Sequence, residues 1–191
     1  MKKILSLATA LLIAVSAIAQ TQTWTLDKDH AKLGFTATHM MISDVEGFFK
    51  TFDIKLAASD ESFTNTKIEL TAQTNSIDTD NKKRDDHLRS ADFFDVEKYP
   101  ELTFKSTSFK KTGDKKYTLT GDLTMHGVTK PVKLDVIFNG TMVHPYTKKT
   151  VAGFKVTGIV KRSDYNLGNT FADAMISDEI TVNANAEFIK D

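Results

Sequence analysis

Residues 76–107 have the sequence SIDTDNKKRDDHLRSADFFDVEKYPELTFKST, which is the most informative segment of this chain. Seven of the nine residues 78–86 are charged, without the alternation of apolar and polar residues that is typical of a strand. A solvated loop has no need of Phe93 and Phe94, and Pro100 is not expected inside a plain helix. We therefore expect the charged part to form a helical lid that covers aromatic side chains and leads back into a sheet.

Outside this segment, apolar and polar residues alternate with a period of two, which predicts β-strands with one buried face. Together with residues 49–56, the pattern predicts eight or nine strands, mostly antiparallel because they follow one another through short turns. A helix is expected only over 82–91, with a further short turn near 170–175. The alternating apolar faces are Trp24 and Leu26; Leu33, Phe35 and Ala37; Ile68, Leu70 and Ala72; Leu102 and Phe104; Tyr117, Leu119, Gly121 and Leu123; Val132, Leu134, Val136 and Phe138; Phe154, Val156, Gly158 and Val160; and Ile180, Val182, Ala184, Ala186 and Phe188.

This pattern makes the fold all-β but leaves its architecture open. An antiparallel sheet of this many strands must close into a barrel or fold into a sandwich to protect its edges. Gly121 and Gly158 lie on apolar faces, where glycine often marks a bend at a barrel corner. Side chains either fill the interior of an eight-stranded barrel or share it with one small ligand.

The N-terminal residues have the composition of a secretory signal peptide. Lys2 and Lys3 precede an apolar run over 4–15, and residues 17–19 form a small-x-small cleavage site. We expect residues 1–19 to be removed and residues 20–191 to form one exported, soluble, periplasmic domain. An uncleaved N-terminal anchor is the alternative, although the run is short for a membrane span.

Charge and composition exclude several classes of partner. Removing Lys2 and Lys3 leaves 23 basic against 25 acidic residues, so the net charge is about −2 with neutral histidines. This balance does not favour nucleic acid or an anionic membrane surface, and no cysteine is present to attach a lipid or form a disulfide. We expect no nucleic-acid partner and no stable membrane anchor, and a homodimer stays open.

Motifs for catalysis or metal binding are missing from the sequence. The five histidines show no HxH, HxxxH or HExxH spacing, and there is no GxSxG elbow or glycine-rich phosphate loop. The segment 78–89 fails as a calcium loop because Lys82, Lys83 and Arg89 occupy essential positions. We therefore expect no metal, no cofactor and no catalytic residue. His39 and His87 are the pair to watch if the chain is a metal-assisted hydrolase.

Charged residues near the lid and at position 162 are expected to have structural roles. The aspartates of 78–80 would cap the helix, and Asp85 would pair with Arg89 on its solvent face. Arg84 and Arg89 have an alternative role, which is to hold an anionic head group at a cavity mouth. Arg162 and Asp164 are expected to form an ion pair that locks the barrel rim.

Phenylalanine dominates the aromatic residues, with thirteen against one tryptophan and four tyrosines. Phe48 and Phe49 are adjacent, as are Phe93 and Phe94, and neighbours on an extended chain cannot point to the same side. At least one member of each pair should therefore find a second apolar environment, such as the underside of a lid or a bound lipid.

Three blocks, in order along the chain, resemble the YceI-like family of secreted bacterial lipid-binding proteins. The first block is 76–107, with its SIDT, RDDHLRS and DFFD elements and Tyr99-Pro100. The second, GDLTMHGVTKPV, covers 121–132, and the third, RSDY, covers 162–165. The family more often continues the third block with Phe and Gly, whereas here Tyr165 is followed by Asn166.

The resemblance implies an elongated, lipocalin-like antiparallel β-barrel of about eight strands, with a short helical lid and a long apolar cavity. It also implies a non-enzymatic binding protein that sequesters or transports a long isoprenoid-type lipid, such as a quinone or prenyl lipid. The alternatives are a metal-assisted hydrolase acting on a lipid head group and a filled β-sandwich that acts as an interaction module. The expected ligand-binding residues are Phe35, His39, Phe48, Phe49, His87, Phe93, Phe94 and Phe104.

Overall fold

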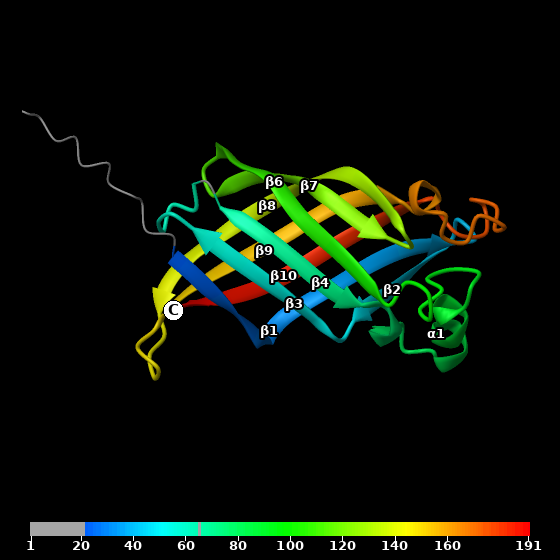
Figure 1. Ribbon diagram of the computed structural model, residues 1–191, viewed down its shortest axis with the longest axis horizontal. Helices are drawn as coiled ribbons and strands as arrows, with labels where there is room; N and C mark the ends of the chain where they lie inside the picture. The colour runs from blue at the N-terminus through cyan, green and yellow to red at the C-terminus, as the bar shows by residue number, and fades with distance from the viewer. Residues whose placement is uncertain (1–21, 65) are drawn as a thin grey trace, which may run out of the picture.

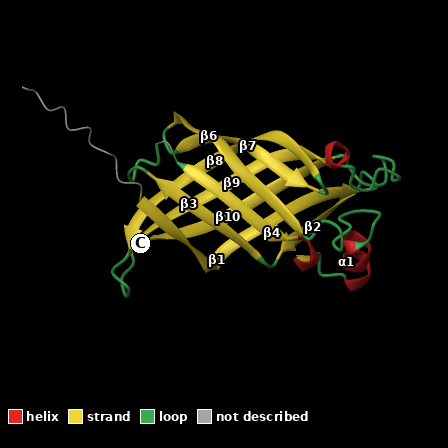
Figure 2. Cartoon of the chain, viewed as in Figure 1, coloured by secondary structure: helices red, strands yellow, loops and turns green. Residues whose placement is uncertain are grey.

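The computed structural model describes residues 22–64 and 66–191, so the predicted signal peptide lies outside the described residues. The described part is an elongated barrel of strands with one short α-helix at one end (Figures 1 and 2). None of its helices is long and apolar enough to cross a membrane. In chain order the elements are β1 (Gln22–His39), β2 (Ser43–Phe49), β3 (Phe52–Ala58), β4 (Lys67–Gln73), η1 (Thr74–Ser76), β5 (Ile77–Asp78), α1 (Lys82–Arg89), β6 (Glu101–Gly113), β7 (Lys116–Met125), β8 (Val128–Val143), β9 (Thr150–Lys161), η2 (Arg162–Tyr165) and β10 (Glu179–Lys190).

The sheet closes on itself because β10 pairs with β1 along most of its length. β2 and β3 run in the same direction against β1, and they form one long strand that bends between Phe49 and Phe52. In the same way, β4 pairs with β3 and β5 pairs with β2, so β4 and β5 together form the next strand of the barrel. Counted so, the barrel has eight antiparallel strands, which confirms the predicted fold and excludes the sandwich.

Gly121 marks a place where the barrel wall bends. It lies opposite Ser106, beside a register shift between Ser106 and Ser108 in the β6–β7 ladder. A Cβ atom at this position would overlap the ring of Phe104, which points inward from β6. Glycine is therefore required here both for the bend and to leave room for an inward-facing aromatic ring.

Aromatic rings fill one end of the barrel, which we call the plug end. Phe63, in the connection between β3 and β4, folds inward and is 0 % exposed. Its ring centroid lies 5.1 Å from Trp24, 5.1 Å from Phe138 and 4.9 Å from Phe154. Packing of these aromatic rings closes this end of the barrel, and the Tyr117 hydroxyl donates to Ser62 O beside Phe63.

The helix α1 lies at the opposite end, which we call the lid end (Figure 1). It ends at Arg89, two residues before the predicted boundary. Its N-cap is Asn81, whose side chain accepts a hydrogen bond from the Arg84 amide at 3.1 Å, so the expected capping by the preceding aspartates is wrong. Asp78 instead accepts from the Asp80 amide and pairs with Lys50.

Candidate functional site: an apolar cavity in the barrel

A cavity of about 240 Å³ lies inside the barrel, between the lid end and the aromatic plug. Its walls are the inward faces of the strands, which the alternation of apolar residues predicts. Among the residues that line it, only Arg162 and Asn183 have polar side chains. A concave, almost wholly apolar space of this kind can enclose an apolar molecule and offers little to hold a polar one.

Five of the eight predicted ligand-binding residues line this cavity. They come from the barrel wall and from the turns after α1, so the cavity is walled partly by the lid. The rings of Phe49 and Phe94 meet edge to face at 5.7 Å, which joins the wall to the lid. The five residues are Phe35, Phe49, Phe93, Phe94 and Phe104.

Both members of the pair Phe93 and Phe94 point into the cavity, so the expectation that they would diverge is wrong. Their segment is a series of turns, because the Phe93 amide donates to Ser90 O at 3.1 Å and the Phe94 amide to Leu88 O at 3.0 Å. Neighbouring side chains on such a turn can converge, whereas on a strand they cannot.

Phe48 behaves as an extended chain requires, and it does not line the cavity. It precedes the inward-facing Phe49 on β2 and therefore lies on the outer face. There it packs close to Gly34, and the Lys32 ammonium lies 5.7 Å from its ring centroid. Phe48 is half-buried on the outer surface, where a cation–π contact partly covers it, so it does not find the second apolar environment that was expected for it.

His39 and His87 also lie outside the cavity lining. His39 is exposed at the end of β1, where it forms a bridge to Ile176. The His87 ring is 5.1 Å from Phe93 and 5.7 Å from Phe171, and its Nε2 lies 3.0 Å from an Asp92 carboxylate oxygen. His87 therefore packs behind the lid wall, against a ring that lines the cavity.

The two histidines do not form the metal site that a hydrolase would need. Among the described residues, the group of side chains close enough to share a metal ion is Asp27, His30 and Glu187. This group lies where β1 bulges away from β10, and it contains neither His39 nor His87. The hydrolase alternative thus loses the pair of residues on which it was based.

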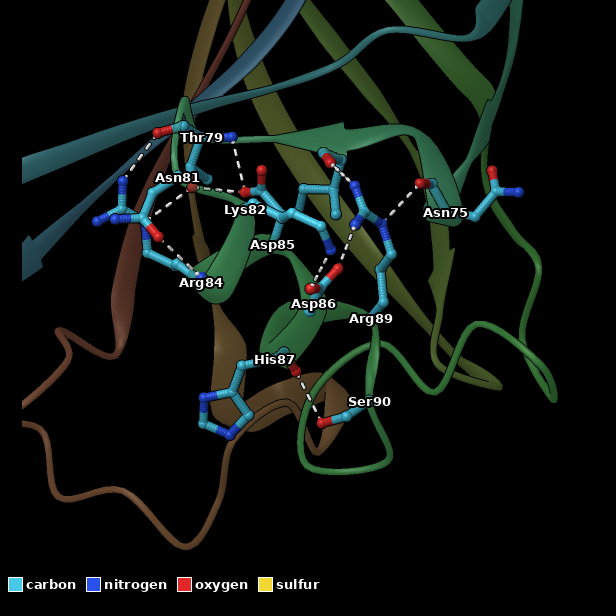
Figure 3. A network of polar contacts seen from close by, with 11 residues as sticks. Asn75, Thr79, Asn81, Lys82, Arg84, Asp85, Asp86, His87, Arg89 and Ser90 are labelled. Carbon is cyan, nitrogen blue, oxygen red and sulfur yellow. Dashed lines mark hydrogen bonds and ion pairs between the residues drawn. The ribbon is translucent and has the colours of Figure 1, made fainter.

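A polar network attaches α1 to the strand segment that precedes it (Figure 3). The Asp85 carboxylate is buried and accepts hydrogen bonds from the Thr79 amide at 2.9 Å and the Thr79 hydroxyl at 2.6 Å. Arg84 donates from Nε to the Thr79 hydroxyl at 2.7 Å and from Nη2 to the Thr79 carbonyl at 2.8 Å. The prediction that Asp85 pairs with Arg89 at the surface is therefore wrong.

Arg89 attaches the other side of α1 to residues 75–77. It donates to the carbonyl oxygens of Asn75 at 2.8 Å and Ile77 at 2.6 Å, and it pairs with Asp86 at 3.2 Å (Figure 3). Ion pairs to Lys82 and Arg89 help to hold the pKa of Asp86 below its usual value, with the Lys82 hydrogen bond as the largest cause. Neither Arg84 nor Arg89 lines the cavity, so the geometry favours their structural role over capture of a head group.

Arg162 is the residue whose position the sequence analysis missed. Its guanidinium group is buried in the cavity wall and donates to the carbonyl oxygens of Leu167, Gly168, Phe171, Ile176 and Ser177. It also donates to Asp173, whereas the expected partner Asp164 pairs with Lys130. Arg162 locks the rim as expected, but through backbone carbonyls and a different carboxylate.

A signal for the inward position of Arg162 is present in the sequence. The inward face of β9 is formed by every second residue, Phe154, Val156, Gly158 and Val160, and Arg162 is the next member of that series. The alternation predicts an inward side chain even though the residue is charged.

The chain matches the model of the YceI-like domain over residues 24–188. It is 37 % identical over 183 residues to Protein YceI of Salmonella newport, which covers 95 % of each chain. The crystal structure of the Campylobacter jejuni YCEI protein is similar, with a TM-score of 0.74 and 32 % identity over 81 % of this chain and 90 % of that one.

A third similar protein is described as a polyisoprenoid binding domain from Saccharophagus degradans. It covers 88 % of this chain and 98 % of its own, with a TM-score of 0.63 and 16 % identity, so the likeness shows a shared fold. On the family model and the Salmonella relative, the chain belongs to the YceI-like family.

Proposed function

We propose that this protein is exported and encloses the apolar tail of a long isoprenoid-type lipid, such as a quinone or prenyl lipid, for transport or sequestration. The observation that carries the proposal is the cavity, whose lining side chains are apolar apart from Arg162, since the Asn183 side chain lies near Phe48 on the outer face. The polyisoprenoid-binding description of the Saccharophagus degradans domain, which has the same fold, supports the class of ligand. The proposal is for binding without catalysis.

Burial of the tail is the proposed source of affinity. Each Å² of apolar surface removed from water contributes about 25 cal/mol, so every added isoprene unit would strengthen binding until the cavity is full. Charge would contribute little, because the donors of the Arg162 guanidinium are already directed at five carbonyl oxygens and one carboxylate. Tail length, rather than the head group, should therefore set affinity.

The proposed ligand contacts are Phe35, Phe49, Phe93, Phe94 and Phe104, with α1 and the turns that follow it as the lid. The predicted signal peptide at residues 1–19 would deliver the chain to the periplasm. There, a closed apolar interior would shield a lipid that is insoluble in water.

The test is native mass spectrometry on protein expressed from the full-length sequence in a bacterium, followed by organic extraction and lipid analysis. A bound species that extracts as a prenyl lipid is expected, and the protein mass also reports whether residues 1–19 were removed. A mass without ligand, unchanged after incubation with prenyl quinones of several chain lengths, would contradict the proposal.

Two neighbouring residues on β10 provide a matched pair of variants. Ala184 lines the cavity, whereas Asn185 is exposed on the outer face. Ala184→Phe should fill the cavity and reduce lipid binding at least tenfold, while Asn185→Phe should leave it unchanged. Equal effects of the two substitutions would place the lipid outside the barrel.

A further inference from the structure

A cluster of exposed apolar side chains lies at the lid end. Met41 is 73 % exposed and Ile42 is 83 % exposed, and Met40 and Met175 are also exposed. We name these four residues the lid-end tip. Figure 1 shows that the turn between β1 and β2 lies at the same end of the barrel as α1, beside the segment between η2 and β10.

Backbone hydrogen bonds hold the tip in place. The Met40 amide donates to Met175 O at 3.0 Å, and the Ser177 amide donates to Thr38 O at 2.9 Å. The Thr38 amide in turn donates to the Ser177 hydroxyl at 2.9 Å. The four side chains are thus displayed by two segments that are fixed to each other.

The backbone of this turn is poorly suited to methionine. The Ile42 amide donates to His39 O at 3.1 Å, and the two central residues have positive φ, 50° at Met40 and 59° at Met41. The central positions of a turn with two positive φ values are dominated by Gly, Asn and Asp, because a Cβ atom disfavours the left-handed region. The sequence instead places two long apolar side chains there, both of them exposed.

The tip is continuous with the wall of the cavity. Met175 precedes Ile176, which lines the cavity, and Ala37 of β1 lines it three residues before Met40. Phe171 of the same segment stacks on the cavity-lining Phe93, with ring centroids 5.3 Å apart. A surface that the tip touches would therefore lie directly beside the lid of the cavity.

Size and charge indicate what kind of surface this is. Four side chains fall well short of the roughly 800 Å² per partner that a stable protein interface buries, whereas a few apolar side chains suffice to enter the boundary of a bilayer. The segments 33–49 and 163–189, which form the tip and the residues beside it, contain no Lys or Arg. In α1, at the same end, Lys82 and Arg89 pair with Asp86, which leaves Lys83 as an exposed cation of the lid. Attraction to anionic lipids is therefore expected to contribute little.

We propose that the lid-end tip docks the barrel reversibly on a neutral or zwitterionic lipid bilayer, with the lid of the cavity against the membrane surface. This inference rests on the proposed function, because a bilayer is the source and destination of a lipid cargo. Docking at this end would let the tail pass between membrane and cavity without crossing water.

The tip can be removed without damaging the turn. Met40→Asn with Met41→Gly supplies the residues that the turn favours and deletes two exposed apolar side chains, and Ile42→Ser deletes a third. Co-flotation with vesicles of phosphatidylcholine alone should fall at least tenfold in this triple variant, while its thermal stability does not decrease. The control is Met142→Ser with Val143→Ser, which removes exposed apolar residues near the β8–β9 turn and should leave flotation unchanged.

Because the chain contains no cysteine, a dye on a single introduced cysteine can report the orientation of the barrel on the membrane. An environment-sensitive dye attached at Ser43→Cys, beside the tip, should shift to the blue on addition of phosphatidylcholine vesicles. The same dye at Thr147→Cys, in the β8–β9 turn, should not shift. An equal shift at both positions, or binding that requires anionic phosphatidylglycerol, would overturn the proposal.

Failure of docking and failure of the proposed function give different results. If the protein takes up a detergent-solubilised prenyl quinone but ignores phosphatidylcholine vesicles, docking is wrong and the carrier function stands. If it binds vesicles through the tip but takes up no quinone, the carrier function is wrong and docking stands. If the triple variant loses uptake of solubilised quinone as well, the tip belongs to the ligand site and the docking proposal is wrong.

Discussion

The two ends of this barrel are closed by different kinds of interaction. At the plug end, Phe63 packs against Trp24, Phe138 and Phe154, and its closure depends on apolar burial. At the lid end, Arg84, Arg89 and Arg162 hold α1 and the segment after η2 through hydrogen bonds to backbone carbonyls and side-chain oxygens.

The difference indicates which end can open. Opening either end would expose aromatic rings to water, including Phe93 and Phe94 at the lid end. The many polar groups at the lid end can, however, exchange protein hydrogen bonds for hydrogen bonds to water, so its opening costs less. We therefore expect the lid end to open locally at a lower free energy than global unfolding, and the plug end to open only when the whole barrel unfolds.

Removal of the central ring of the plug should have the largest effect. Phe63→Ala replaces a fully buried aromatic ring by a methyl group, and we expect a loss of about 3–5 kcal/mol in the free energy of unfolding. Urea denaturation measures this loss. Phe48→Ala, on the outer face of β2, should cost much less, and equal losses would mean that Phe63 is not the centre of a packed plug.

Arg162 provides the corresponding test at the lid end. Arg162→Met removes the donors for five carbonyl oxygens and one carboxylate in a buried setting, and should cost about 3 kcal/mol. The effect should be local, so hydrogen exchange should accelerate over residues 163–178 more than in β6 and β7.

Asp173→Asn is the matched control for Arg162→Met. The Asp173 side chain is 76 % exposed and accepts only one of the hydrogen bonds from the guanidinium group. Solvent screens such a pair, so the substitution should change the free energy of unfolding by less than about 0.5 kcal/mol. A large loss would show that the Arg–Asp pair, rather than the carbonyl oxygens, holds the segment.

The contrast between the ends also explains what could be predicted from the sequence. The strands follow from the period of two, which is a local property of each segment. Closure into a barrel depends on the long-range pairing of β10 with β1, and the same alternation would suit a sandwich. The plug was not predicted because Phe63 lies in a connection, where no periodicity marks an inward side chain.

The candidate site was predicted in part for the same reason. The alternation of side chains along β2 requires Phe48 and Phe49 to point to opposite sides of the sheet. Which of the two faces the barrel interior depends on the register of β2 with β1. The alternation of side chains along a strand does not apply to Phe93 and Phe94, because their segment is a turn. For Arg162 the alternation along β9 indicated an inward side chain, but the adjacent Asp164 was the expected partner. The carbonyl oxygens come instead from the irregular segment that follows η2, whose path no periodicity predicts.

Two tyrosines give the smallest and most specific test of the comparison. At the lid end, Tyr165 is 1 % exposed, and its hydroxyl has no hydrogen-bond partner among the described residues. Burial is the main cause that raises the pKa of Tyr165 to about 12, with the nearby Asp164 charge second. The hydroxyl is thus buried without a compensating hydrogen bond.

We expect Tyr165→Phe to raise the free energy of unfolding by about 1 kcal/mol, because it removes an unsatisfied polar group without creating a cavity. The matched substitution near the plug end is Tyr117→Phe. The Tyr117 hydroxyl donates to Ser62 O at 3.0 Å, so its removal should destabilise the protein by about 1 kcal/mol. Urea denaturation of both variants measures the two effects. If both substitutions destabilise the protein, the Tyr165 hydroxyl has a partner, such as a buried water molecule, and the lid end is better satisfied than its direct contacts indicate.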